Sequence, residues 1–401
     1  MQLSRRSRAA LAILWLGTLY SAPSLTGVLP DDEAEVLYDH YAGDDQVIHG
    51  TTWLIRKKIG DSFSVQYSRV TDIVSGASVD VRETGASPYV EERDENNVAL
   101  TYLSGETTFA MNYIGSTEPD YISNTANFSI SRDMFGDLTT VSMNYSREWD
   151  DIFKMEKIQD AQGGYIKIHD PSFGEKHMDE RTYGVGLTQV LTRNMILALN
   201  YQAITDQGFI SNPYREARYL DPTSGRGWSL EQEVYPGTRT SNAIGSDLKY
   251  YLPYRAALDL QYRYYFDTFG IRAQTVQLGY TQPWHNWTFD GTARYYLQSQ
   301  ASFYSDLYPY LGSQNFVSGN QDISAYHSYS LGAQASYQFT IPHASWIQKT
   351  TANVRYDRLV TNYENFHEWN LTNPSGGIEP GDEPLFTLHA DIYEIFLSLW
   401  F

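Results

Sequence analysis

Seven short segments of the chain share the pattern apolar-x-apolar-x-Tyr, and each follows a signal for a tight turn. In one of them, Ile59-Gly60-Asp61 precedes Phe63-Ser64-Val65-Gln66-Tyr67. A period of two predicts β-strands that have one apolar and one polar face. In each copy the tyrosine ends the apolar half, which predicts a position at a membrane interface. These tyrosines are Tyr67, Tyr113, Tyr145, Tyr201, Tyr262, Tyr295 and Tyr356.

The segments that precede the turns alternate in the same way, as in Ala126, Phe128 and Ile130. Seven turns join fourteen strands, and a first strand at Glu33 to Ala42 and a carboxyl-terminal strand bring the expected number to about sixteen, with fourteen as the alternative. The connections at the other end are mixed in length. Short ones lie near Asp44, Pro119 and Gly270, and long ones span 74–91, 150–180, 206–238, 300–323 and 363–384.

The carboxyl-terminal strand ends on an aromatic residue that follows apolar residues at every second position. Because side chains alternate along a strand, these residues share one face. The pattern resembles the terminal strand that bacterial outer-membrane barrels present to their assembly machinery, and an ordinary last strand of a soluble sheet is the alternative. The residues are Tyr393, Ile395, Leu397, Leu399 and Phe401.

Composition favours a membrane barrel over a soluble sheet. Beyond the amino-terminal region no apolar run is long enough for a membrane helix, so a membrane protein of this polarity must be a barrel. Aromatic residues make up 15% of the chain and include 33 Tyr, which suits aromatic girdles. We therefore predict an all-β protein, a single transmembrane antiparallel up-and-down barrel with short periplasmic turns and long extracellular loops.

The amino terminus has the layout of a secretory signal peptide. Arg5, Arg6 and Arg8 precede the apolar run from Ala9 to Leu16, and small residues follow near Ala22. We expect a signal peptide at about 1–24 and the barrel at 25–401, in the outer membrane of a Gram-negative cell. Because the chain has no cysteine, a lipid anchor, a disulfide and a cysteine-ligated metal are excluded.

The formal net charge of −19 argues against a nucleic-acid partner, because few cations are present to neutralise phosphates. Acidic outer loops explain this charge, and a vestibule that attracts cations is the alternative.

Several longer motifs resemble a family of Gram-negative proteins catalogued as domain of unknown function 3570. They include Arg56-Lys57-Lys58-Ile59-Gly60-Asp61, Phe135-Gly136-Asp137-Leu138-Thr139-Thr140, Asn212-Pro213-Tyr214-Arg215 and Tyr251-Leu252-Pro253-Tyr254-Arg255. The resemblance runs from about Leu29 to Phe401 and implies an outer-membrane barrel, with no catalytic or binding residue carried over. Members are often encoded beside a small lipoprotein and a flavin-attaching transferase, which implies a periplasmic lipoprotein or flavoprotein as a candidate partner.

Charged residues cluster at positions that alternate with the apolar ones on the later strands, and these should face the lumen. Pairing among them that stabilises the wall is one interpretation, and a ring that selects ions is the other. The candidates are Asp259, Arg263, Asp290, Arg294 and Arg355, with Asp357 and Arg358 beside them.

No sequence motif indicates catalysis or a cofactor. The loop from His169 to Glu180 holds two imidazoles and several carboxylates, but their spacing matches no metal motif, so we predict no metal site. The pairs His327 with Ser328 and His389 with Ser398 are the only hints of a lipid hydrolase.

We therefore expect no enzyme. A porin-like channel or transporter for a small solute or ion is the leading hypothesis. A membrane-embedded scaffold that docks a periplasmic lipoprotein or flavin-linked redox partner is the second, and an outer-membrane lipid hydrolase is the third. Outer-membrane lipid and the barrel-assembly machinery are the expected partners in each case.

Overall fold

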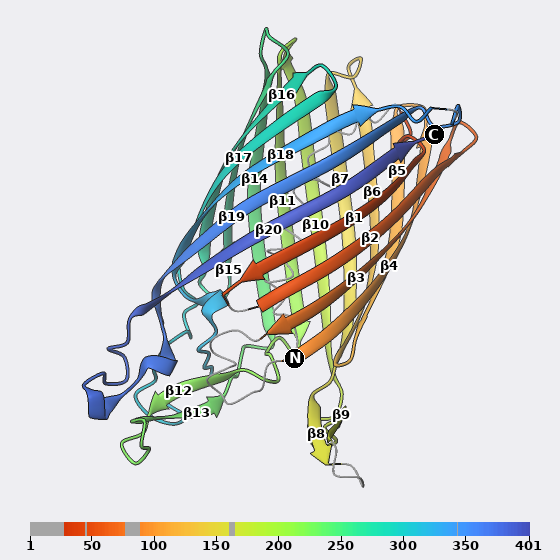
Figure 1. The fold of residues 1–401 in the computed structure, drawn as a ribbon. Coiled ribbons are helices and arrows are strands. Elements are labelled where there is room, and N and C mark those ends of the chain that lie inside the picture. The colour runs from red at the N-terminus through yellow and green to blue at the C-terminus, as the bar shows by residue number, and fades with distance from the viewer. Residues whose placement is uncertain (1–27, 45, 77–88, 160–164, 343) are drawn as a thin grey trace.

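Sixteen antiparallel strands close into one barrel in the computed structural model, which describes residues 28–44, 46–76, 89–159, 165–342 and 344–401 (Figure 1). Each strand pairs with its neighbour along the chain, and β1 pairs with β20 from Glu33 opposite Trp400 to Gly43 opposite Ala390. The barrel strands are β1 Glu33–Gly43, β2 Gln46–Ile59, β3 Phe63–Gly76, β4 Tyr89–Ser104, β5 Thr107–Glu118, β6 Tyr121–Met134, β7 Thr139–Ile152, β10 Lys176–Thr192, β11 Met195–Gly208, β14 Thr238–Tyr251, β15 Ala257–Asp267, β16 Arg272–Trp284, β17 Trp287–Gln298, β18 Tyr326–Phe339, β19 Lys349–His367 and β20 Leu385–Trp400. The predicted sixteen strands are confirmed.

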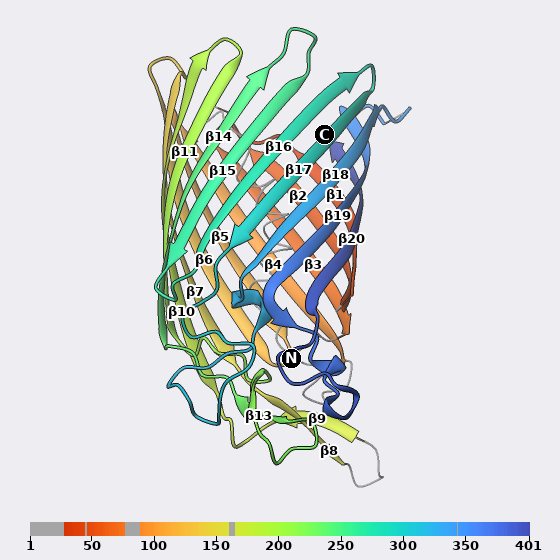
Figure 2. The same ribbon diagram turned by 90° about the vertical axis from the view of Figure 1, so that its left-hand side faces the viewer.

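The seven predicted turns all lie at one end of the barrel, which we call the turn end. Three of them place a glycine in the left-handed region that other residues rarely adopt, because Gly60, Gly105 and Gly136 have φ values of 63°, 58° and 65°. The carboxyl terminus lies at the same end, as Figure 1 shows. The opposite end, which we call the loop end, carries the long connections, and these extend well beyond the strands (Figure 2).

The outer face of the barrel is apolar. Residues such as Met111 and Leu331 are 60% and 64% exposed, as expected for side chains that would meet lipid rather than a core. All seven tyrosines of the repeated pattern lie on this face and are between 39% and 47% exposed. Five of their hydroxyls donate to a polar side chain on an adjoining strand. The pairs are Tyr67 with Asn96, Tyr113 with Asn124, Tyr201 with Asn242, Tyr262 with Gln274 and Tyr356 with Asp391.

The inner face is polar over most of its area, and the apolar packing is confined to small clusters. One such cluster joins Tyr41, Ile48, Val74 and Ile392 inside the wall near the loop end. Others lie among the loops beyond the strands. Within the described ranges, no helix is long and apolar enough to cross a bilayer.

Two of the long connections contain small sheets that the sequence did not predict. β8 (Met155–Gln159) pairs with β9 (Tyr165–His169), and β12 (Glu216–Leu220) pairs with β13 (Trp228–Gln232). Three-residue helical turns occur at η1 (Gln321–Ile323), η2 (Trp369–Leu371) and η3 (Pro374–Gly376). The first strand, expected at Glu33 to Ala42, ends one residue later at Gly43. The expected signal peptide at 1–24 lies outside the described residues.

Neighbouring positions on β5 test which face meets lipid. Met111→Arg should lower the free energy of unfolding in lipid vesicles by about 2–4 kcal/mol, because it places a charge on the lipid face. The matched variant Ala110→Arg places the same side chain on the inner face and should have a clearly smaller effect. Denaturant titration of both refolded proteins gives the two values. A larger loss for Ala110→Arg would mean that the faces are assigned the wrong way round.

Candidate functional site

All five predicted lumen residues lie on the inward face of the later strands. Three of them have close polar partners. Arg355 Nε lies 2.5 Å from Asp357 Oδ2 and 4.0 Å from Glu394 Oε2, so its charge is compensated on β19 and β20. Asp259 Oδ2 lies 3.6 Å from Lys249 Nζ, and Asp290 accepts a 2.5 Å hydrogen bond from the Thr281 hydroxyl. Arg355 and Asp259 are thus paired with opposite charges along the wall, and Asp290 is hydrogen-bonded to a hydroxyl.

Arg263 and Arg294 behave differently. Within the part of the chain that the structure describes, no carboxylate oxygen lies within the 4.0 Å limit of an ion pair from either guanidinium. The two residues lie on β15 and β17, with β16 between them, where Arg263 is opposite Thr275 and Arg294 is opposite Gln277. Arg294 has an aromatic neighbour instead, since its Cζ lies 5.9 Å from the centre of the Tyr296 ring.

Arg358 does not belong to this group, and its assignment to the lumen was wrong. It lies three residues after Arg355, so strand alternation places it on the outer face with Tyr356. There its Nη1 lies 2.6 Å from Asp391 Oδ2 on β20. Period-two spacing alone excludes a lumen position for Arg358.

Acidic side chains gather on another part of the wall. Asp39 of β1 and Asp357 of β19 are buried against it, and Glu394 of β20 faces inward beside them. On β3 and β4, Asp72 and Glu95 also face inward, with Arg93 Nη2 at 2.9 Å and 3.8 Å from their carboxylates. In the strand order β4 is eight strands from β16, which places it directly across the barrel from the two arginines.

Inward glycines let polar side chains lie flat against the wall. A Cβ added to Gly50 would come within 2.1 Å of the Asp39 carboxylate, and one added to Gly332 would come within 2.1 Å of Asp357. The same arrangement places Asn144 over Gly184 and Asn200 over Gly245. These side chains therefore cover the neighbouring strand instead of projecting into the lumen.

Three long connections are joined at the loop end by one buried arginine. Arg218 of β12 is fully buried, and its Nη2 lies 2.5 Å from Asp306 Oδ2 in the connection between β17 and β18. Its Nη1 donates to Glu383 Oε1 at 2.7 Å in the connection between β19 and β20. The Trp369 ring covers the guanidinium, with 5.0 Å between Cζ and the ring centre. We call the assembly of 209–237, 299–325 and 368–384 the loop cap.

Backbone and aromatic contacts extend this network. Leu220 and Arg218 exchange backbone hydrogen bonds with Tyr308 at 2.8 Å and 2.9 Å, so the 299–325 connection adds a third extended segment beside β12. Trp369 Nε1 donates to Asp306 Oδ1 at 2.7 Å. The loop cap is thus a folded unit with its own polar and apolar core.

Two carboxylates of the loop cap, Asp306 and Glu383, are held in their charged form. Burial raises the pKa of Asp306, but hydrogen bonds from His367 and Trp369 and the charge of Arg218 outweigh it, so the net pKa is lowered. Burial likewise raises the pKa of Glu383, and hydrogen bonds from Arg218 and Thr372 reverse the effect, which leaves this pKa lowered too.

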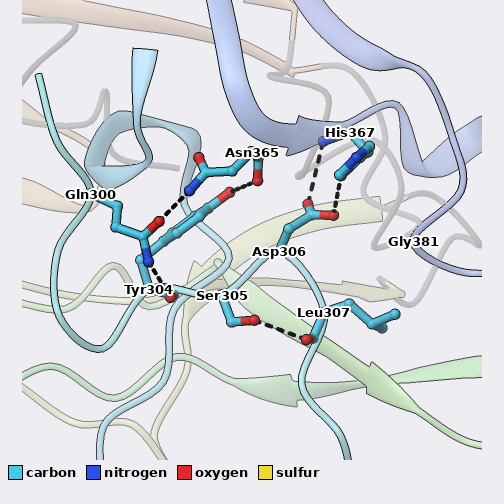
Figure 3. Close-up of a pocket in the computed structure, with 8 residues that line it drawn as sticks. All are labelled: Gln300, Tyr304, Ser305, Asp306, Leu307, Asn365, His367 and Gly381. Atoms are coloured by element: carbon cyan, nitrogen blue, oxygen red, sulfur yellow. Dashed lines mark hydrogen bonds and ion pairs between the residues drawn. The ribbon is translucent and has the colours of Figure 1, made fainter. Parts of the chain in front are cut away.

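A small open pocket of ≈ 270 Å³ lies where the loop cap meets the ends of β17 and β19 (Figure 3). His367 Nδ1 lies 2.8 Å from Asp306 Oδ2, and the Tyr304 hydroxyl donates to the Asn365 carbonyl at 2.9 Å. The Ser305 hydroxyl donates to the Leu307 carbonyl at 2.8 Å rather than to His367. The polar groups that line the pocket thus bind one another and join the loop cap to the barrel.

Of the remaining sequence candidates, His177 lies in a cluster with two carboxylates: its ligand atom and those of Asp151 and Glu175 are all within 4.8 Å of one another. The other candidates are dispersed. His169 Nε2 is bonded to the Pro119 carbonyl at 3.1 Å, whereas His177 lies 2.8 Å from Asp151, with Glu175 nearby on an exposed surface. His327 and Ser328 are consecutive on β18 and face opposite sides of the wall. His389 and Ser398 also have opposite parity and lie nine residues apart on β20.

Sequence reasoning missed the buried Arg218 and its partners Asp306 and Glu383. Their separations of 88 and 165 residues carry no local signal. The inward glycines had a signal, because they occupy polar-face positions of strands such as β10 and β14, where glycine otherwise weakens a strand.

A closed barrel with an apolar outer face and a polar inner face defines the class of transmembrane β-barrels. The chain belongs to the family described as "Protein of unknown function (DUF3570)", which it matches over residues 6–365. The predicted family is confirmed. A comparison with curated proteins found no match.

Several solved structures are similar in fold. One is CdiB from Acinetobacter baumannii, with 11% identity, 92% of this chain and 60% of that chain covered, and a TM-score of 0.47. A bacterial polysaccharide outer membrane secretin has 7% identity and a TM-score of 0.46, with 94% of this chain and 100% of that chain covered. The siderophore receptor PirA from Acinetobacter baumannii has 9% identity and a TM-score of 0.42, with 83% of this chain and 53% of that chain covered. The chain therefore spans about half the length of that receptor.

Removing Arg218 should release the loop cap without opening the barrel. In Arg218→Met the buried carboxylates of Asp306 and Glu383 lose their counter-ion, which should destabilise the closed loop cap by about 3–5 kcal/mol. Chymotrypsin should then cut within 209–237, 299–325 or 368–384 much faster, while the strands stay protected. The control Arg358→Met breaks an exposed ion pair of similar length, worth about 0–1 kcal/mol. Equal cleavage of both variants would contradict the assigned role.

Acid should loosen the loop cap. Because the folded-state pKa values of Asp306 and Glu383 lie below the ordinary 3.8 and 4.5, their contribution to stability is complete above those values. It is lost as the pH falls through the lowered folded-state pKa values. Pepsin should therefore cut the loop cap readily at about pH 2 and only slowly near pH 5, after correction for its own activity. A cleavage rate that rises with pH would show that these carboxylates do not hold the loop cap closed.

Proposed function

We propose that the protein is a channel in the outer membrane that lets small hydrophilic solutes or ions pass. The observation that carries the proposal is the contrast between the two faces of the closed wall. Its outside carries residues such as Met111, Leu199 and Ile395, and its inside carries Asn, Gln, Ser, Thr and charged side chains. Barrels of about sixteen strands are wide enough to leave an aqueous interior.

Several features support this location and orientation. The tyrosines that bound the apolar belt suit a membrane interface, where a ring meets lipid and its hydroxyl meets water. Short turns on one side and long connections on the other match periplasmic and extracellular ends, so the turn end would face the periplasm. The terminal strand, with Tyr393, Ile395 and Leu397 on the lipid face, would be read by the assembly machinery.

The flat packing of the inward side chains also favours passage. Asp39, Asn144 and Asn200 lie over glycines of the adjoining strand, which keeps their bulk on the wall. If the interior were a packed core, large interlocking side chains would stabilise it better, because protein interiors pack about as densely as crystals. We expect the protein to act without catalysis or a bound cofactor.

A scaffold is the second candidate function, and the loop cap is the observation that favours it. A unit joined through buried Arg218 presents a fixed surface beyond the barrel, unlike a set of independent loops. In that case the loop cap, at the extracellular end, would bind a partner at the cell surface, such as a lipoprotein, while the interior stayed closed. A periplasmic lipoprotein or flavoprotein would have to dock at the turn end instead.

Single-channel recording separates the two candidates. We expect the refolded barrel to give steady, reproducible openings in a planar bilayer, because a polar interior of this width conducts ions. Swelling of liposomes in small sugars should give a size limit for solutes. Silence in both measurements, by a protein that is correctly refolded on a gel, would exclude the channel and favour the scaffold. Release of fatty acid from lipid by the same preparation would instead indicate a hydrolase.

A further inference from the structure

Arg263 and Arg294 are the exception among the inward-facing arginines that the structure describes. Each of the others has a carboxylate within ion-pair distance on its own or an adjoining strand. The pairs are Arg56 with Glu33 at 2.9 Å, Arg93 with Asp72 at 2.9 Å, Arg355 with Asp357 at 2.5 Å, and Arg239 with Asp267. The wall thus compensates its arginines as a rule, and the exception falls at two residues that are close together.

The wall between the two arginines offers no negative charge. Across β15, β16 and β17, one row of cross-strand partners reads Gln261, Gln277 and Arg294, and the adjacent inward row reads Arg263, Thr275 and Tyr296. The carboxylates at the border of this patch are Asp259, Asp290 and Asp247, the last of which lies opposite Gln261. Asp247 and Asp259 contact Lys249, and Asp290 contacts Thr281. The patch is therefore composed of hydrogen-bond donors, amides and one phenol, with two positive charges.

Two like charges held this close repel each other, and nothing in the wall requires them. Adjoining strands are about 4.8 Å apart, so the two backbones lie on the order of 10 Å from one another and both side chains point into the same part of the lumen. Flexible guanidinium arms can then converge on one ligand between them. An anion there would remove the repulsion and use donors that have no carboxylate partner in the wall.

We propose that Arg263 and Arg294 form an oxyanion-binding site on the lumen wall, which takes the carboxylate or phosphate group of a small solute. Planar guanidinium groups present parallel N–H donors that match two oxygens of either group. Gln261, Gln277 and Thr275 add uncharged donors around them. A role for this site in the passage of a solute rests on the proposed channel, whereas the binding of an anion to the site does not.

The acidic side chains elsewhere on the wall strengthen this assignment. Glu95 of β4 lies directly across the barrel from β16, with Asp72 on the adjoining β3, and Glu394 extends the acidic region toward β20. An anion in the lumen is repelled from that region and attracted to the arginines. An anionic solute is therefore favoured at the patch of the two arginines over the acidic part of the wall across from it.

Calorimetric titration of the refolded barrel in detergent tests the site directly. Citrate and inorganic phosphate are the probes, and glucose is the uncharged control. We expect at least one anion to bind and glucose not to bind. Arg263→Gln and Arg294→Gln should each weaken that binding by roughly tenfold or more, because each removes a charge-assisted contact. Binding of citrate alone, phosphate alone or both identifies which oxyanion the site accepts.

The control variant is Arg56→Gln, which removes an inward arginine that already has a carboxylate partner. It should leave anion binding unchanged. The double Lys variant, Arg263→Lys/Arg294→Lys, keeps the charge but loses the forked donors, so it should bind weakly while folding as the wild type does. If neither anion binds, if Arg263→Gln and Arg294→Gln bind as the wild type does, or if Arg56→Gln loses as much affinity, the site is refuted.

Reversal potentials give an independent readout. The double variant Arg263→Gln/Arg294→Gln should shift selectivity in a salt gradient toward cations, whereas the double Lys variant should not. An unchanged potential in the Gln variant would also overturn the proposal. Anion binding in a barrel that never conducts would refute the proposed channel and leave the oxyanion site standing.

Discussion

Backbone hydrogen bonding is the constraint on which this structure depends. In lipid no water can satisfy a free N–H or C=O group, so a sheet that crosses a membrane must have no open edge. Here the seam between β1 and β20 removes the last edge, with eleven consecutive residue pairs from Glu33 opposite Trp400 to Gly43 opposite Ala390. Once the wall is closed, strand alternation alone sends one set of side chains to lipid and the other to the lumen. Both the apolar belt and the charged interior follow from that closure.

The same constraint explains why the fold could be predicted from sequence. The features used for the prediction are local: a period of two, a tyrosine at a fixed place and a turn signal before each copy. Each of them corresponds to the same element in the barrel. The number of strands follows from the number of turns, since each turn, such as the one at Gly60, joins two strands. The alternation of side chains along a strand also places Arg263 and Arg355 inside the barrel. The assignment of Arg358 to the lumen ignored this alternation and was wrong.

Contacts between distant segments could not be predicted in this way. Arg218 lies in a connection without regular hydrophobic spacing, and its partners Asp306 and Glu383 belong to two other connections. Only tertiary packing brings them together, because no local rule relates residues 88 or 165 positions apart. The small sheets β8–β9 and β12–β13 were missed for a related reason, since strands of five residues carry too few alternations to stand out.

Charge is treated differently inside the wall and in the loop cap, and the difference bears on function. In the loop cap, Arg218 is buried, so an unpaired charge there would be severely destabilising and its carboxylate partners are obligatory. In the lumen, Arg263 and Arg294 keep part of their surface exposed, as Arg355 does, so burial does not set them apart from it. Stability therefore does not explain why Arg355 has a carboxylate partner whereas these two have none. Neutral polar residues at positions 263 and 294 would stabilise the barrel equally well. Two adjacent cations, by contrast, repel each other. A solute that carries the opposite charge gives the arrangement a physical reason, which the fold by itself does not supply.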